Sequence, residues 1–373
     1  MKHIVIVGGS FGGVSTAHRF LKQASKVTEG SFKVTLVSRD SHFYWNIATP
    51  RALIPGQIPD EKIFQPIAPG FAHYPKGSVE VILGTATGID AEGKKLEVTV
   101  DGQTQHIVYD YLILATGSKY LANTPFKSQG STEDTIAGLH EMQEQIRHAK
   151  NIVVVGSGAT GVEISGELGF EYGAGEKKIT LISRGATVLE GRPDKVTQTA
   201  EKQLQSLNVN LQLNTSIKDT VQLPDGSKEL VLSDGKKLAA DLIIPTNGVV
   251  PNSSFVPSKF LNKDGFIRVD DDLRVIDSSD IFAIGDVSDH EPPQYMFVEK
   301  QSIHMAKNIV HLINNMPLVP HKASTTAMMG LQIGKKTGTG HMGNFKIPSF
   351  LVHFLRKTLF VENLPKTVDG SML

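Results

Sequence analysis

Two glycine-rich turns, at residues 8–13 and 156–161, constrain this chain more than any other feature. The first is Gly8-Gly9-Ser10-Phe11-Gly12-Gly13, after the apolar residues 4–7, and the second is Gly156-Ser157-Gly158-Ala159-Thr160-Gly161, after the apolar residues 152–155. Each apolar run is typical of a buried parallel strand, and each turn opens a stretch that is typical of a helix. In such turns, backbone N–H groups and a helix N-terminus attract a pyrophosphate. The pattern predicts an α/β chain with two nucleotide sites.

The composition excludes several kinds of chemistry. The chain contains no cysteine, and 38 basic residues balance 38 acidic ones. A redox-active dithiol, a thiolate nucleophile, an iron–sulfur cluster and a cysteine-ligated zinc site are therefore excluded, and we expect no metal in the reaction. The balanced charge argues against a nucleic-acid partner.

The sequence also bears on the compartment of the protein. A chain without disulfides fits a reducing environment. The first predicted strand begins almost at the N-terminus, which leaves no room for a cleavable signal sequence. We therefore expect an intracellular protein.

The most apolar segment near the C-terminus is residues 350–361, which begin with Phe350 and end with Val361. As a helix, this segment places Phe350 and Phe354 on one face, with Arg356 close by. It is too short to span a bilayer. Two interpretations remain open: a helix that docks on the protein core, or a surface that touches a membrane.

Four motifs and a closing segment give the chain a family resemblance. They are residues 5–13, residues 114–118, residues 156–163, residues 282–286 and, with the character of fungal members, residues 347–351. The chain resembles the flavoproteins with two dinucleotide-binding domains, and among them the type II NAD(P)H dehydrogenases. Within that branch it is most similar to the apoptosis-inducing-factor-like, ferroptosis-suppressor type of NAD(P)H:quinone oxidoreductase.

The resemblance implies two Rossmann-like domains, the second inserted in the first. Residues 1–118 and 249–320 would form the FAD-binding domain, residues 119–248 the NAD(P)H-binding domain, and residues 321–373 a small C-terminal region. The insertion follows from chemistry, because Gly285 and Asp286, at the end of a late strand, belong with the N-terminal site.

The FAD site implied by the resemblance draws on several separate segments of the chain. Asp286 would accept a hydrogen bond from a ribityl hydroxyl, and Arg51 would contact cofactor phosphates or position its loop. Gln301 would reach the isoalloxazine or the acceptor pocket, or lie on a plain helix surface. The expected cofactor-binding residues are Gly8, Gly9, Ser10, Phe11, Gly12, Gly13, Ser38, Arg39, Arg51, Ala115, Thr116, Gly117, Gly285 and Asp286.

One position departs from the family pattern. The second strand usually ends in an acidic residue that binds the flavin ribose, but here Ser38 stands there, followed by Arg39 and Asp40. Ribose recognition must therefore use Asp40, Arg39 or the Ser38 hydroxyl. The rival hypothesis places NADP in this first site.

The second site would hold the nicotinamide dinucleotide. Its expected cofactor-binding residues are Gly156, Gly158, Gly161, Arg184 and Gly248, and the resemblance places Glu163 beside the nicotinamide as the catalytic residue. Ser183-Arg184 stands where an acidic residue would select NAD. Because arginine can pair with a 2′-phosphate, we expect NADPH to be favoured or at least accepted, with NADH as the alternative donor.

The resulting hypothesis is an FAD-dependent oxidoreductase that passes a hydride from NAD(P)H to a quinone-type acceptor. It would work in the cytoplasm or on an organelle surface, such as a mitochondrion or lipid droplet. The missing dithiol excludes a disulfide reductase. Two alternatives remain: an NAD(P)H-gated, apoptosis-inducing-factor-like signalling flavoprotein, and a reductase of a protein electron carrier.

Overall fold

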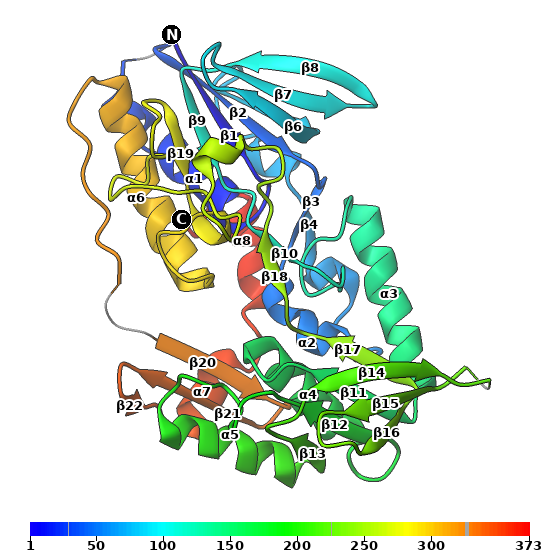
Figure 1. Ribbon diagram of the computed structural model, residues 1–373. Coiled ribbons are helices and arrows are strands. Elements are labelled where there is room, and N and C mark those ends of the chain that lie inside the picture. The colour runs from blue at the N-terminus through cyan, green and yellow to red at the C-terminus, as the bar shows by residue number, and fades with distance from the viewer. Residues whose placement is uncertain (29, 225, 325–327) are drawn as a thin grey trace.

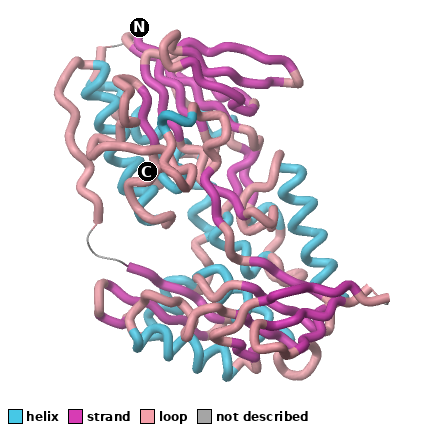
Figure 2. The backbone as a smooth tube through the Cα atoms, in the orientation of Figure 1, coloured by secondary structure: helices cyan, strands magenta, loops and turns pink. Residues whose placement is uncertain are grey.

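A computed structural model describes residues 1–28, 30–224, 226–324 and 328–373. The chain forms two α/β lobes, with the N-terminus in one of them and a C-terminal segment that runs back to it (Figure 1). Strands and helices alternate in both lobes, as Figure 2 shows. The predicted α/β class with two Rossmann-like units is confirmed.

The first lobe is built on a five-stranded parallel sheet. Its strands, in spatial order, are β19 (Ile281–Ala283), β9 (Tyr111–Leu114), β1 (Lys2–Val7), β2 (Phe32–Ser38) and β5 (Val79–Leu83). Side chains alternate across β1, so that Ile4 and Ile6 join one apolar cluster while Val5 and Val7 join another. Helices α1 (Phe11–Leu21) and α6 (Tyr295–Ile313) pack together on the first side.

An antiparallel sheet covers the opposite side of that parallel sheet. It consists of β6 (Thr85–Asp90), β7 (Lys95–Val100) and β8 (Gln103–Val108). Leu96 and Val98 of β7 share a buried cluster with Val5 and Val7, which explains why β1 is apolar on both faces.

The second lobe repeats this plan. Its parallel sheet has the order β13 (Val209–Gln212), β12 (Lys178–Ile182), β11 (Asn151–Val155) and β17 (Leu242–Pro245). Helices α4 (Ala159–Tyr172) and α5 (Asp194–Ser206) contact this sheet. The antiparallel strands β14 (Ile217–Gln222), β15 (Lys228–Leu232) and β16 (Lys237–Ala240) form a separate sheet, and Leu230 packs with Val153 of β11.

A two-stranded antiparallel ribbon connects the lobes. It pairs β10 (Ser118–Tyr120) with β18 (Val249–Pro251). The expected domain boundary at 118/119 falls inside β10, and the one at 248/249 falls directly before β18. Helix α3 (Thr132–His148) follows β10 and begins with a capping box between Ser131 and Asp134. The long segment after β2 adds β3 (His42–Tyr44), β4 (Phe64–Pro66) and the short helix α2 (Thr49–Ala52).

The C-terminal region contacts both lobes. Strands β20 (Met328–Ile333), β21 (Thr337–Met342) and β22 (Phe345–Lys346) form a sheet against α4 and α5, followed by α7 (Ser349–Arg356). The chain then returns to the first lobe, where α8 (Leu364–Val368) contacts α1 (Figure 1). Residues 325–327 of the expected C-terminal region lie outside the described residues.

N-terminal side chains hold backbone carbonyls of this returning segment. Trp45 Nε1 donates to the Leu359 carbonyl at 2.9 Å, and Lys22 Nζ donates to the Gly370 carbonyl at 2.6 Å. His18 Nε2 lies 2.7 Å from the Val368 carbonyl. These contacts fix the segment between residues 359 and 370 against the first lobe.

The expected helix over residues 350–361 is wrong in its second half. Helix α7 ends at Arg356, and Leu359 and Phe360 adopt left-handed φ values of +53° and +58°. The physical reason is that side chains of the first lobe bind the carbonyls beyond Arg356, which pulls the chain out of helical geometry. Among the described residues, no helix is both long and apolar enough to cross a bilayer.

Most of the apolar side chains of α7 face solvent. Val352 is buried, whereas Phe350 and Phe354 are 75% and 64% exposed, and Leu355 is also exposed. The helix therefore docks on the core through one edge and leaves its larger aromatic side chains uncovered.

Candidate functional site

A cavity of about 720 Å³ lies between the lobes, and twelve of the expected site residues line it. These are Gly8, Gly9, Ser10, Phe11, Gly12, Arg39, Ala115, Thr116, Gly117, Glu163, Gly285 and Asp286. The remaining expected residues do not line it: Gly13, Ser38, Arg51, Gly156, Gly158, Gly161, Arg184 and Gly248.

The first glycine turn is shaped by close backbone packing. Gly8 has a φ of +129°, and a Cβ there would lie 2.3 Å from the Ala115 carbonyl oxygen. A Cβ at Gly13 would lie 1.9 Å from the Gly8 carbonyl oxygen. Both positions therefore require glycine. Helix α1 begins after Ser10, whose side chain makes no capping hydrogen bond, so the helix N-terminus faces the cavity with backbone donors available to an anion.

The second turn has the same construction. Gly156 has a φ of +110°, and a Cβ at Gly161 would lie 1.8 Å from the Gly156 carbonyl oxygen. A Cβ at Gly158, in contrast, would meet nothing within 4 Å, so packing does not demand glycine there. This open space at the N-terminus of α4 fits the close approach of a dinucleotide pyrophosphate.

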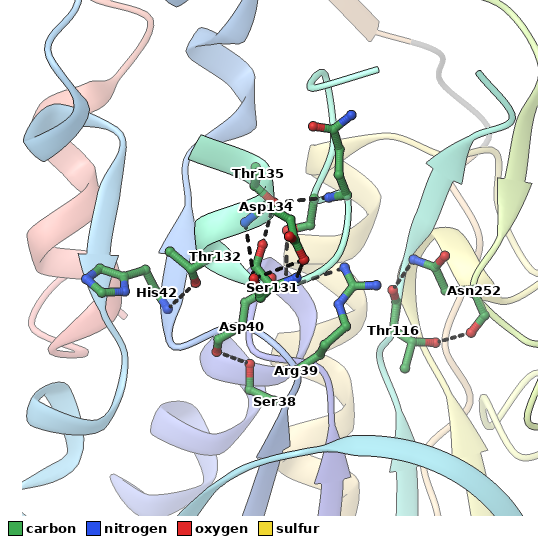
Figure 3. A network of polar contacts seen from close by, with 12 residues as sticks. Ser38, Arg39, Asp40, His42, Thr116, Ser131, Thr132, Asp134, Thr135 and Asn252 are labelled. Atoms are coloured by element: carbon green, nitrogen blue, oxygen red, sulfur yellow. Dashed lines mark hydrogen bonds and ion pairs between the residues drawn. The ribbon is translucent and has the colours of Figure 1, made fainter. Parts of the chain in front are cut away.

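The structure distinguishes among the three candidates for ribose recognition. Ser38 packs against Gly9 so closely that a Cβ on Gly9 would lie 2.0 Å from Ser38 Oγ. The Ser38 hydroxyl donates to the Asp40 carbonyl at 2.6 Å (Figure 3). Arg39 and Asp40 instead line the cavity. Asp40 Oδ1 is buried without a hydrogen-bond partner among the described residues, which is the environment a ribose hydroxyl would complete.

The charge state of Asp40 reflects opposing influences. Burial raises the pKa of the Asp40 carboxyl, while Arg39 and the Ser128 hydroxyl oppose this rise. A hydroxyl donor from a ligand would stabilise the ionised form further. Asp40 therefore fits the role that the acidic residue at the end of the second strand has in the family.

Thr116 is bound to Asn252 through both its side chain and its backbone. Its Oγ1 donates to the Asn252 carbonyl at 2.8 Å, and Asn252 Nδ2 donates to the Thr116 carbonyl at 2.9 Å (Figure 3). These two bonds fix the strand end where Gly117 adopts a φ of +65°. The Thr116 side chain is thus engaged with the protein.

Asp286 lies at the cavity with a cation that the sequence analysis missed. Lys127 Nζ is 2.6 Å from Asp286 Oδ2, and Ser118 Oγ donates to the same oxygen at 3.0 Å. Lys127 comes from the loop between β10 and α3 and belongs to no motif, so no local sequence signal could have identified it. A ligand hydroxyl that binds Asp286 would also meet this ammonium group.

Gln301 is neither on a helix surface nor directed into the cavity. It is buried in α6, where its Oε1 accepts the Gly285 N–H at 2.6 Å and its Nε2 donates to Glu291 Oε2 at 2.9 Å. Gln301 therefore holds the backbone of the loop that presents Asp286. Burial alone would raise the pKa of Glu291, but hydrogen bonds from Ser324 N–H, Gln301 and His321 lower it below its usual value.

Glu163 lies one turn into α4 and contacts the C-terminal region. Arg356 Nη2 donates to Glu163 Oε1 at 3.1 Å, and both residues line the cavity. Burial raises the pKa of the Glu163 carboxyl to about 7, although Arg356 acts in the opposite direction. A carboxyl with this pKa can hold or release a proton near neutral pH.

The contacts of Arg51 fit the second of its two expected roles, the positioning of its loop. Its Nε and Nη2 both donate to Glu167 Oε1, at 3.0 and 2.8 Å, and its Nη1 donates to the Lys357 carbonyl at 2.7 Å. The side chain is buried and away from the cavity lining, so contact with cofactor phosphates is not supported. Arg51 points away from the cavity because Glu167, one helical turn after Glu163, is buried and its carboxylate needs a cation as a partner.

Arg184 is exposed at the end of β12, beside the second glycine turn. Ser183 Oγ lies 2.6 Å from Ser157 Oγ, so a hydroxyl pair stands where an acidic side chain would select NAD. Arg184 makes no ion pair with any residue that the structure describes. Its role in cofactor choice stays a prediction.

The chain is similar to proteins of known family. Residues 2–308 match the family described as pyridine nucleotide-disulphide oxidoreductase. The chain is 62% identical to oxidoreductase ptaL of Pestalotiopsis fici, over 100% of both chains. It is 29% identical to ferroptosis suppressor protein 1 of Homo sapiens, over 99% of this chain and 96% of that protein. The sulfide:quinone oxidoreductase of Aquifex aeolicus has the same fold, with a TM-score of 0.80 at 20% identity over 99% of this chain and 92% of the other.

These matches confirm the predicted resemblance and agree with the geometry of the site. The open space at Gly158 and the orphaned oxygen of Asp40 fit the cofactors of this family, FAD and NAD(P)H. The chain belongs to the pyridine nucleotide-disulphide oxidoreductase family, as a flavin-dependent NAD(P)H oxidoreductase without the dithiol.

Proposed function

We propose that this protein reduces a quinone-type acceptor at a membrane surface, with NADPH as its preferred electron donor. The observation that carries the proposal is the position of Glu163. Its carboxyl, with a pKa of about 7, lines the same cavity as the first glycine turn and Asp286, and it is bound to Arg356 of the apolar helix α7. The cavity thus brings together the first glycine turn, a proton-exchanging group and Arg356 of the helix that carries the exposed apolar side chains.

Reduction of a quinone to a hydroquinone needs two electrons and two protons. When bound, FAD supplies the electron pair that it takes from NAD(P)H. The residues of the chain hold the reactants and manage protons. Glu163 holds a proton on its carboxyl below pH 7 and can deliver it at the cavity, while hydrogen bonds from Arg356 and from the Gln332 backbone hold the carboxyl in place.

The surface of α7 supports the membrane part of the proposal. Phe350, Phe354 and Leu355 are exposed on this helix, and Arg356 and Lys357 adjoin them. Exposed aromatic side chains beside basic ones are typical of a helix that lies in a lipid headgroup layer. A quinone with a long apolar tail would reach the cavity from this surface.

Cofactor preference is proposed from Arg184. The exposed guanidinium stands beside the Ser183–Ser157 hydroxyl pair, and an acidic residue that would repel a 2′-phosphate is replaced by Ser183. A phosphate dianion there would gain charge-assisted hydrogen bonds. NADPH is therefore preferred over NADH.

The deciding experiment measures NADPH and NADH oxidation by the FAD-loaded protein with short-tailed and long-tailed quinones, with and without anionic liposomes. We expect turnover with both quinones and a stimulation by liposomes only for the long-tailed quinone. Slow turnover with every quinone would favour the signalling hypothesis. Rapid reduction of a ferredoxin-type protein without quinone turnover would favour the electron-carrier reductase.

A further inference from the structure

Two histidines and a glutamate meet in a cluster outside the cavity, next to the loop that carries Asp286. His290 and Glu291 follow that loop, and His321 comes from the segment between α6 and β20. We propose that His290, Glu291 and His321 form a binding site for a divalent transition-metal cation of the Zn²⁺ class. No sequence motif indicates this site, because its residues follow no recognised metal-ligand spacing.

The ligand atoms are already close together. One nitrogen or oxygen of each of the three residues lies within 4.8 Å of the other two. Glu291 Oε2 and His321 Nε2 are 3.0 Å apart. His290 Nε2 is a buried atom without a hydrogen-bond partner among the described residues. Ligands at 2.0–2.2 Å from a tetrahedral cation lie about 3.4 Å apart, a spacing between the 3.0 Å of the Glu291–His321 pair and the 4.8 Å limit of the cluster, so the side chains need only small adjustments.

The donor set selects the kind of metal. Two imidazole nitrogens and one carboxylate are ligands of Zn²⁺ and similar ions, whereas Mg²⁺ and Ca²⁺ prefer oxygen. Glu291 and His321 are each 7% exposed, and His290 is half-buried, so the protein encloses most of the site. A water molecule would complete a tetrahedral set.

A neighbouring histidine forms a wall of the site. The ring of His304 lies 5.1 Å from that of His321, measured between centroids. Its Nε2 donates to the Val319 carbonyl oxygen, which also accepts from Asn308 Nδ2. His304 thus limits the movement of His321 and is not counted among the ligands.

The groups around Glu291 resemble the supporting shell of a metal site. Gln301 Nε2 donates to Glu291 Oε2 at 2.9 Å, and Ser324 N–H donates to Oε1 at 2.8 Å. Such hydrogen bonds orient a ligating carboxylate. Because Gln301 also accepts the Gly285 N–H, a bound metal would stiffen the loop that presents Asp286. Metal binding is nevertheless distinct from the proposed quinone reduction and is tested without it.

The experiment titrates ZnCl₂ into the metal-stripped, FAD-loaded full chain and follows binding by calorimetry. We expect one Zn²⁺ per chain and a higher melting temperature in its presence. His290→Ala should weaken binding at least about tenfold, because it removes one of three ligands. His290 makes no hydrogen bond through Nε2, so this variant should fold as the parent does.

A matched control and a second measurement complete the test. His148→Ala removes an exposed histidine of α3 and should leave Zn²⁺ affinity unchanged. X-ray absorption at the zinc edge should show nitrogen and oxygen ligands with two imidazoles. The proposal is overturned if the parent binds no Zn²⁺, or if His290→Ala binds it as tightly as the His148→Ala control.

Discussion

Arg356 Nη2 lies 3.1 Å from Glu163 Oε1, although 193 residues separate them in the sequence. This contact joins α7 of the C-terminal region to α4 of the second lobe at the wall of the cavity. One helical turn later, Glu167 binds Arg51 of the first lobe in the same manner. Two carboxylates on one helix therefore fix two separate parts of the chain around the site.

Replacing Glu163 should change the pH dependence of quinone reduction. The Glu163 carboxyl, with a pKa of about 7, loses its proton as pH rises through neutrality, so proton delivery should decline in the parent above pH 7. Glu163→Gln should lower kcat by about 100-fold, the lower end of a general-acid contribution, and remove this pH dependence. Steady-state rates with a short-tailed quinone between pH 5.5 and 9 give the profile.

The partner of Glu163 provides the control for that profile. Arg356 lowers the pKa of Glu163, so Arg356→Leu should move the decline to higher pH, while Arg356→Lys should keep it near its original place. If Glu163→Gln and Arg356→Leu both show the parental pH profile, Glu163 has no part in proton delivery.

Breaking the Arg51–Glu167 pair should destabilise the fold. Side chains of the two residues are 10% and 3% exposed, so Arg51→Leu leaves a buried carboxylate without its cation. We expect a loss of about 3–5 kcal/mol in the free energy of unfolding. The double variant Arg51→Leu, Glu167→Leu should recover most of it in urea-unfolding measurements; equal instability of the single and double variants would show that the charge is unimportant.

Substituting the exposed aromatics of α7 should separate membrane binding from catalysis. Phe350→Ser with Phe354→Ser should weaken liposome binding at least about tenfold, since each side chain would bury apolar area in lipid. Activity with a short-tailed quinone should be unchanged. Val108→Ser, which alters an exposed residue of the distant strand β8, is the control. Unchanged liposome co-sedimentation of the double variant would rule out α7 as the membrane contact.

Reversing the charge of Arg184 should reverse cofactor preference. Arg184→Glu would place a carboxylate where a 2′-phosphate binds, and kcat/KM with NADPH should fall at least about tenfold with little change for NADH. Arg184→Lys should show an intermediate effect because a single ammonium lacks the bidentate geometry. A parental ratio of NADPH to NADH activity in the Glu variant would contradict the assignment.

Local patterns were sufficient for the repeated parts of the fold. The runs before Gly8 and Gly156 are buried strands because their residues are apolar on both faces, and the glycines follow from the backbone contacts that they permit. The C-terminal helix was misjudged in length. Its apolar pattern continues past Arg356, but Trp45 and Arg51 bind the carbonyls that a longer helix would have used.

The sequence by itself determined the two glycine turns, the strand that ends in Gly285 and Asp286, and the absence of thiol chemistry. These depend on residues that are neighbours in the chain, so local geometry and composition are enough. Only the tertiary structure decided that Arg356 pairs with Glu163, that Lys127 pairs with Asp286 and that Arg51 pairs with Glu167. A buried charge needs a partner of opposite charge, and the packing of elements that are distant in the sequence determines which residue that partner is. Local sequence patterns therefore cannot predict these pairs.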